Sequence, residues 1–126
     1  MKALKILKII LYLLFALLFI NAGLDKFFHY MPMPEMTTEM QKVMDAFTTL
    51  KWVMLLTGMV ELVAGILILF PKTRVLGAVM IFPVMIGIIC HNATFMPQGL
   101  VIAGVLFVIN ISMIADNWSK IKPLFS

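Results

Sequence analysis

Residues 52–70 read Trp52-Val-Met-Leu-Leu-Thr-Gly-Met-Val-Glu-Leu-Val-Ala-Gly-Ile-Leu-Ile-Leu-Phe70, an apolar run with a single charged side chain, Glu61. At about 1.5 Å per helical residue, the run is long enough to cross the roughly 30 Å hydrocarbon core of a bilayer. Glu61 would then lie about half way across. An ionised carboxylate at that depth costs at least a few kcal/mol unless it is paired or hydrogen-bonded, so Glu61 is a candidate functional residue.

The composition indicates the same environment for the whole chain. Of the 126 residues, 63% are hydrophobic and 13% are charged, and the mean hydropathy is +1.07. Such a chain is too apolar for a water-soluble surface. We therefore predict an all-α polytopic membrane protein, in which one domain over residues 1–126 forms a bundle of four transmembrane helices. The expected helices lie at about 5–28, 51–70, 74–92 and 99–117, and an outer loop occupies 29–50.

The distribution of basic residues predicts the orientation. Seven of the ten lie on one side of the predicted membrane: Lys2, Lys5, Lys8, Lys72, Arg74, Lys120 and Lys122. By the positive-inside rule both termini are cytoplasmic, and the loop at 29–50 faces outward. The first helix is expected to be retained, because no Ala-x-Ala-like cleavage site follows it. We predict a multi-pass protein of a bacterial cytoplasmic membrane. No basic patch is interleaved with aromatic residues, so no nucleic-acid partner is expected.

The outer loop contains a second periodic pattern. Met31-Pro-Met-Pro34 cannot continue the first helix, because proline lacks the backbone N–H. Beyond it, apolar residues recur at steps of three and four, as an amphipathic helix places them: Met36, Met40, Val43, Met44 and Phe47. This helix is expected to lie on the outer membrane surface or to cap the bundle. Copper(I) capture by the loop methionines Met31, Met33, Met36 and Met40 is the minor alternative to an apolar lid.

Small residues mark the faces on which helices can approach. Gly58, Glu61 and Gly65 are spaced by three and four residues, so they line one stripe of the second membrane helix. Glu61 should therefore face the interior of the bundle. Pro83 lies inside the third membrane helix and is expected to kink it.

Several polar residues could meet Glu61 in a pocket that opens outward. Asn21 and Lys26 end the first helix, His91 and Asn92 end the third, and Asn110 lies deep in the fourth. Two interpretations stay open. In one, these side chains make hydrogen bonds that only fix helix packing. In the other, they line a ligand or proton site in which Glu61 relays a proton.

Three motifs resemble the DoxX-like family of small four-helix membrane proteins. They are Gly23-Leu-Asp-Lys-Phe27, Gly58-Met-Val-Glu-Leu-Val-Ala-Gly65 and the basic turn Pro71-Lys-Thr-Arg-Val-Leu-Gly77. The length, the spacing of the apolar segments and the expected topology are also similar along essentially the whole chain. The resemblance carries over six positions: Gly23, Lys26, Phe27, Gly58, Glu61 and Gly65. The glycines and Phe27 are expected to serve helix packing.

The resemblance implies an association with membrane oxidoreductase systems, such as a thiosulfate:quinone oxidoreductase subunit. Similar four-helix proteins include assembly factors such as nicotinic receptor chaperones. This chain differs from the thiosulfate-oxidising members in being a short, lone four-helix unit. The resemblance therefore does not supply a substrate.

The residue inventory limits redox chemistry within the chain. Cys90 is the only cysteine, so an internal Cys-x-x-Cys relay is excluded. His29 and His91 could in principle ligate haem, but His29 belongs to a loop and haem is not expected. No metal site is expected either, because adjacent residues such as Cys90 and His91 point about 100° apart on a helix.

Two hypotheses of different classes follow. The first is a subunit or accessory factor of a membrane oxidoreductase system, with a polar pocket around Glu61 that binds a quinone or another apolar ligand. The second is a non-enzymatic membrane chaperone, assembly factor or scaffold. No self-contained catalytic constellation is present, so the sequence leaves enzymatic activity open. The expected partners are the lipid bilayer and another membrane protein or redox subunit, and a homo-oligomer is a further candidate.

Overall fold

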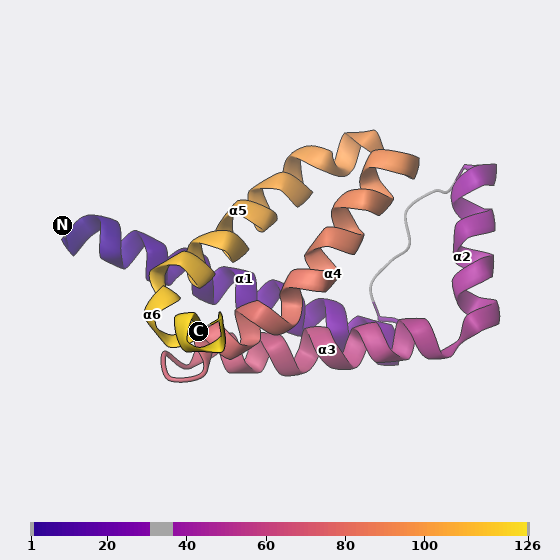
Figure 1. Cartoon of the computed structure of the whole chain (residues 1–126). Helices are drawn as coiled ribbons and strands as arrows, with labels where there is room; N and C mark the ends of the chain where they lie inside the picture. Colours follow the sequence, from indigo (N-terminus) through magenta and orange to yellow (C-terminus); the bar gives the residue numbers. More distant parts are fainter. Residues whose placement is uncertain (1, 31–36, 126) are drawn as a thin grey trace.

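The computed structural model describes residues 2–30 and 37–125, and all its regular elements in that part of the chain are helices. Within these residues, four helical segments are long and apolar enough to cross a membrane: α1 (Lys2–Phe28), α3 (Trp52–Leu69), α4 (Arg74–Phe95), and the segment Pro97–Asp116 that contains α5 (Leu100–Asp116). Shorter helices are α2 (Thr38–Leu50), η1 (Pro97–Gly99), α6 (Trp118–Ile121) and η2 (Lys122–Phe125). The prediction of an all-α polytopic membrane protein is confirmed (Figure 1).

The membrane helices pack in the order α1, α3, α4, α5. The most extensive contact joins α1 to α3, and α4 packs between α3 and α5, whereas α1 and α5 make few contacts with each other. The core side chains come from all four helices and include Phe15, Phe19, Ile68, Ile81, Met85 and Met113. An apolar groove of about 540 Å³ lies between Leu11 of α1 and the face of α5 that carries Gly104.

The α1–α3 contact depends on glycines at the crossing. A Cβ atom added to Gly23 would lie 2.7 Å from the carbonyl oxygen of Gly58, and one added to Gly65 would lie 2.9 Å from the carbonyl oxygen of Ala16. At these separations a side chain would collide with the backbone of the other helix. Because the association of helices in lipid relies on close packing, these glycines determine how near α1 and α3 can lie.

Helix α2 turns away from the direction of α3 and lies at one end of the bundle (Figure 1). Thr37 caps its first turn, since the Thr37 side chain accepts a hydrogen bond of 3.2 Å from the backbone N–H of Met40. Lys51 separates α2 from α3 with a φ of 56°, a left-handed conformation that allows the chain to turn sharply. An amphipathic helix at the end of a membrane bundle is suited to lie along the membrane surface.

The apolar face predicted for the outer loop is the inward face of α2. Met40, Val43, Met44 and Phe47 are half-buried, whereas their neighbours Gln41 and Lys42 are exposed. An amphipathic helix in this loop is therefore confirmed. Met31, Met33 and Met36, which the sequence places in the same apolar lid, lie outside the described residues.

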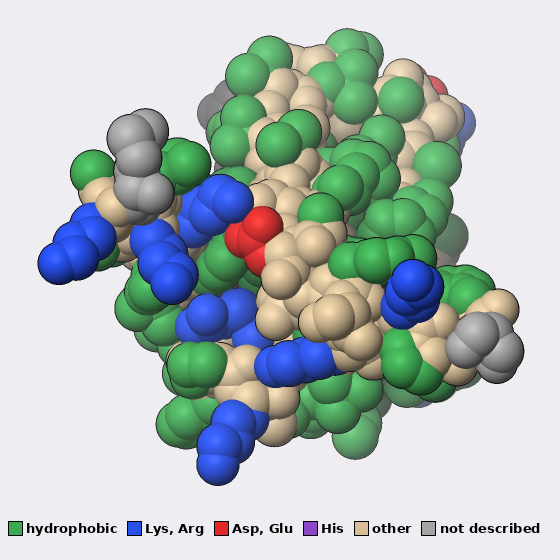
Figure 2. Space-filling model, turned by 60° about the vertical axis from the view of Figure 1, so that its left-hand side comes forward, with side chains coloured by type: hydrophobic (Ala, Val, Ile, Leu, Met, Phe, Trp, Pro, Cys, Tyr) green, Lys and Arg blue, Asp and Glu red, His purple; other side chains and the backbone are tan. Residues whose placement is uncertain are grey.

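The opposite end of the bundle is basic. The start of α1, the α3–α4 turn and the C-terminal segment lie together at this end (Figure 1), and Figure 2 shows Lys and Arg side chains gathered there around an acidic side chain. We call this part of the molecule the basic end. Its cations are Lys2, Lys5, Lys8, Lys72, Arg74, Lys120 and Lys122.

Candidate functional site

Lys26 of α1 and Glu61 of α3 form an ion pair inside the bundle. The distance between Lys26 Nζ and Glu61 Oε1 is 2.5 Å, and the Glu61 side chain is only 3% exposed. Gly58, one turn before Glu61, allows this contact, because a Cβ atom there would lie 3.0 Å from the Cβ of Lys26. The glycine lets the last turns of α1 lie close over α3, so that the lysine reaches the carboxylate.

A cavity of about 570 Å³ adjoins this ion pair. Lys26 lines it, whereas Glu61 is not among the lining residues and lies behind the lysine. The other lining side chains come from three helices: Met44 and Phe47 of α2, Val53, Met54 and Thr57 of α3, and Pro83, Val84, Ile88 and His91 of α4, which also contributes Gly87. The cavity is thus apolar along most of its wall and has polar groups at Lys26, Thr57 and His91.

His91 is held at the junction of α2 and α4. Its ring lies 6.4 Å from the Phe47 ring and 5.5 Å from the Phe95 ring, measured between centroids. The half-buried face of α2 therefore reaches the last turns of α4 and covers one side of the cavity. Lys26 and His91 are the two predicted ligand-binding residues that the structure places on the same cavity wall.

Two of the other predicted site residues lie away from this wall. Asn21 is exposed, and its side chain accepts a hydrogen bond from the hydroxyl of Tyr30. Asn92 donates from Nδ2 to the carbonyl oxygen of Ile88 in its own helix at 2.8 Å. Both side chains therefore bond within the chain near the ends of their helices.

Asn110 is fully buried and joins α5 to α4. Its Nδ2 donates to the carbonyl oxygen of Ala78 at 3.0 Å, while its Oδ1 has no hydrogen-bond partner within the described residues. Val79 follows Ala78 in α4, and its carbonyl oxygen lacks a helical hydrogen bond because Pro83, four residues later, has no backbone N–H. Asn110 therefore binds beside a stretch of α4 that is weakened by the loss of this hydrogen bond. This geometry supports a packing role for Asn110 and does not bring it to the cavity.

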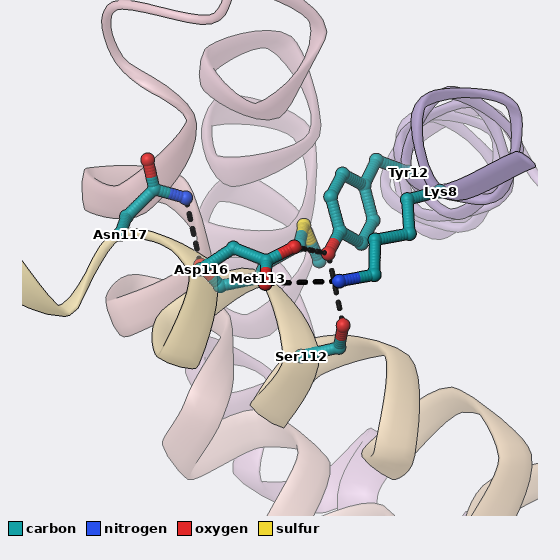
Figure 3. Close-up of polar contacts among 6 residues, drawn as sticks. All are labelled: Lys8, Tyr12, Ser112, Met113, Asp116 and Asn117. Atoms are coloured by element: carbon teal, nitrogen blue, oxygen red, sulfur yellow. Dashed lines mark hydrogen bonds and ion pairs between the residues drawn. The ribbon is translucent and has the colours of Figure 1, made fainter. Parts of the chain in front are cut away.

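A second polar cluster, which sequence reasoning missed, joins α1 to α5 at the basic end (Figure 3). The hydroxyl of Tyr12 donates to Asp116 Oδ2 at 2.5 Å and lies 2.9 Å from the hydroxyl of Ser112. Lys8 Nζ lies 3.2 Å from Asp116 Oδ1. The signals in the sequence were the four-residue steps from Lys8 to Tyr12 and from Ser112 to Asp116, which place each pair on one face of its helix.

Arg74 extends this cluster to the α3–α4 turn. Its guanidinium carbon lies 5.5 Å from the centroid of the Tyr12 ring, and its Nε donates to the carbonyl oxygen of Ile68 at 2.9 Å. Arg74 is buried, and Ile68 is a core residue of α3. The contacts of Tyr12 and Arg74 therefore connect α1, α3, α4 and α5 at this end.

Two further candidates for redox or metal chemistry, Cys90 and His29, do not line the cavity. Cys90 is free and exposed, and His29 is exposed just beyond the end of α1. Within residues 2–30 and 37–125, no three His, Cys, Asp or Glu side chains group closely enough to hold a metal ion.

Comparison with known proteins gives a family. The profile of the family described as methylamine utilisation protein MauE matches residues 4–103. No curated protein matches the chain significantly, and no solved structure does. The DoxX-like assignment is therefore wrong. Its motifs consist of a glycine stripe, a buried ion pair and a basic turn, which are general packing and orientation features of small membrane bundles. Since the match covers most of the 126 residues, the chain belongs to the MauE family of methylamine utilisation proteins.

Proposed function

We propose that this membrane protein is an accessory component of a redox system and that its cavity binds a quinone or another apolar ligand with a polar head group. The family description supports the first part, because use of the carbon and nitrogen of methylamine requires oxidation of the molecule and an acceptor for its electrons. The cavity between α2, α3 and α4 supports the second part.

The cavity next to the Lys26–Glu61 pair is the observation that carries the proposal. Its volume of about 570 Å³ falls within the range of small-molecule sites, which are mostly apolar with a few polar groups. Lys26 contributes an ammonium group that forms the ion pair with Glu61 and has three N–H donors. A head-group oxygen would accept a hydrogen bond from Lys26 or His91, and the isoprenoid or acyl chain would lie against Val53, Met54 and Val84.

In this proposal Glu61 acts through Lys26. The carboxylate holds the ammonium group in place and is the candidate proton relay when the ligand gains or loses protons. The ion pair with Lys26 explains how a carboxylate can lie half way along α3, where the Glu61 side chain is almost completely buried.

We further propose that the protein lies in the cytoplasmic membrane with the basic end facing the cytoplasm. The concentration of cations at that end supports this orientation. The cavity and α2 would then lie near the outer surface.

Filling the cavity tests the proposal. Gly87 lines the cavity, and a Cβ atom added there would meet no atom of another helix within 4 Å, so Gly87→Leu should fill space without displacing a helix. Gly104→Leu is the matched control, because Gly104 also has open space and lies in the separate groove between α1 and α5. Binding of decylubiquinone to each purified variant would be measured in mild detergent, together with native mass spectrometry of endogenous lipids and quinones.

The expected result is loss of quinone binding in Gly87→Leu and retention in Gly104→Leu. Glu61→Gln should weaken binding in a protein that remains folded. Equal binding by wild type and Gly87→Leu would reject the cavity as the site. A wild-type protein that binds no small molecule and co-purifies with another membrane protein would instead favour the non-enzymatic assembly factor.

A further inference from the structure

We propose that the basic end binds anionic phospholipids through its exposed lysines and through an aromatic pair in the C-terminal segment. This inference is independent of the cavity and of its ligand. It follows from how the charges at this end are paired and from the exposed side chains between Trp118 and Phe125.

The charge at the basic end is largely uncompensated. Asp116 accepts hydrogen bonds from both Lys8 and Tyr12, so its carboxylate is already occupied (Figure 3). No other Asp or Glu is present at this end of the described chain. Five exposed lysines have no carboxylate partner within residues 2–30 and 37–125: Lys2, Lys5, Lys72, Lys120 and Lys122.

The C-terminal segment has the side-chain pattern of an interfacial anchor. Ile121 is 6% exposed and attaches the segment to the bundle, whereas Leu124 and Phe125 are largely exposed. The rings of Trp118 and Phe125 stack with their centroids 5.7 Å apart. Tryptophan and other aromatic side chains favour the head-group layer of a bilayer, where an apolar ring can lie beside charged groups.

The lysines of the C-terminal segment add positive charge near the aromatic pair. Lys120 and Lys122 flank the buried Ile121, so they place two ammonium groups in the same short segment as the stacked rings. An anionic phospholipid offers a phosphate for the lysines and acyl chains for the aromatic pair. A soluble phosphate would engage only the lysines, so the combination favours a membrane lipid as the occupant. The binding constant for an anionic membrane surface rises by roughly fivefold for each basic residue near that surface.

Native mass spectrometry of the delipidated full-length protein would test this inference. Phosphatidylglycerol and phosphatidylcholine with identical acyl chains would be titrated into separate samples. The double variant Lys120→Gln/Lys122→Gln removes two charges at the basic end. The control Lys42→Gln/Lys51→Gln removes two charges from exposed positions at the other end of the bundle. Trp118→Ala/Phe125→Ala removes the aromatic contribution.

Wild type should retain phosphatidylglycerol in preference to phosphatidylcholine. Substitution of Lys120 and Lys122 should weaken phosphatidylglycerol binding by roughly 25-fold, as expected for two cations, and the control should retain wild-type binding. The aromatic variant should lose affinity for both lipids. Equal affinity of wild type for the two lipids, or equal weakening by the basic-end and control variants, would overturn the inference.

Discussion

Lys26 and Glu61 form an ion pair whose two partners differ in their access to solvent. The lysine side chain is 20% exposed and lines the cavity, whereas the glutamate side chain is 3% exposed and lies behind it. A lysine left alone can extend toward water on its flexible stem. A carboxylate left alone at the position of Glu61 stays enclosed by helices. Loss of the lysine and loss of the glutamate should therefore change the stability of the protein by different amounts.

Lys26→Met should destabilise the protein more than Glu61→Gln. Removal of one partner from a buried ion pair typically costs about 3–5 kcal/mol, and we expect about 2–4 kcal/mol for Lys26→Met because Lys26 is partly exposed. The double variant Lys26→Met/Glu61→Gln should recover part of this loss, since it contains no unpaired charge. Unfolding in mixed micelles with a rising fraction of SDS would give the three free-energy changes. Strictly additive changes would show that the two side chains do not interact.

The glycines at the α1–α3 crossing should be intolerant of side chains. In Gly23→Leu the new Cβ would lie 2.7 Å from the backbone oxygen of Gly58 and 2.8 Å from the backbone nitrogen of Leu62. Backbone atoms cannot rotate away, so the helices must separate. We expect a loss of about 2–4 kcal/mol, comparable to other severe packing defects. Gly104→Leu is the control and should unfold at nearly the wild-type SDS fraction. Wild-type stability of Gly23→Leu would show that the helices do not cross here.

The helices themselves follow from the sequence because each apolar run has the length that a bilayer requires. The run around Glu61 predicts a helix at 51–70, and α3 spans Trp52–Leu69. The third helix extends to Phe95, three residues beyond the predicted end at 92. The last turn is closed by the backbone N–H of Met96, which donates to the carbonyl oxygen of Asn92 at 2.9 Å, and the side chains of Asn92 and Thr94 bond to carbonyl groups one turn earlier. Such local hydrogen bonds do not appear in a hydropathy pattern.

The partners of the polar residues were much harder to predict. Asn21 and Lys26 both lie near the end of α1, but five residues correspond to about 140° around a helix, so they point in different directions. The Lys26 side chain points toward α3, whereas the Asn21 side chain is exposed at the surface of the bundle. The link between Tyr12 and Asp116 joins residues 104 positions apart and requires knowledge of which helices are neighbours. Helix order and rotation determine such contacts, and neither is encoded in the length of an apolar run.

Tyr12→Phe should loosen the contact between α1 and α5. The phenolic hydroxyl makes the hydrogen bond to Asp116 and lies within hydrogen-bond distance of Ser112, and α1 and α5 have few other contacts. Loss of the hydroxyl should cost about 1–3 kcal/mol, since one of its partners is a carboxylate. Ser112→Ala is the control and should cost less, because the Tyr12–Asp116 hydrogen bond remains. The SDS unfolding midpoints would be compared, and equal midpoints for Tyr12→Phe and wild type would show that this cluster does not stabilise the bundle.

Labelling of single cysteines should show which end of the bundle faces the cytoplasm. In a Cys90→Ser background, Thr48→Cys places a thiol on the exposed surface of α2, and Ser119→Cys places one at the basic end. If the basic end is cytoplasmic, a membrane-impermeant maleimide should label Thr48→Cys in intact cells and should label Ser119→Cys only after the membrane is permeabilised. Labelling of both variants in permeabilised cells is the control for thiol access. The reverse pattern would place the cavity and α2 near the cytoplasm, and the ligand would then have to enter the cavity from that side.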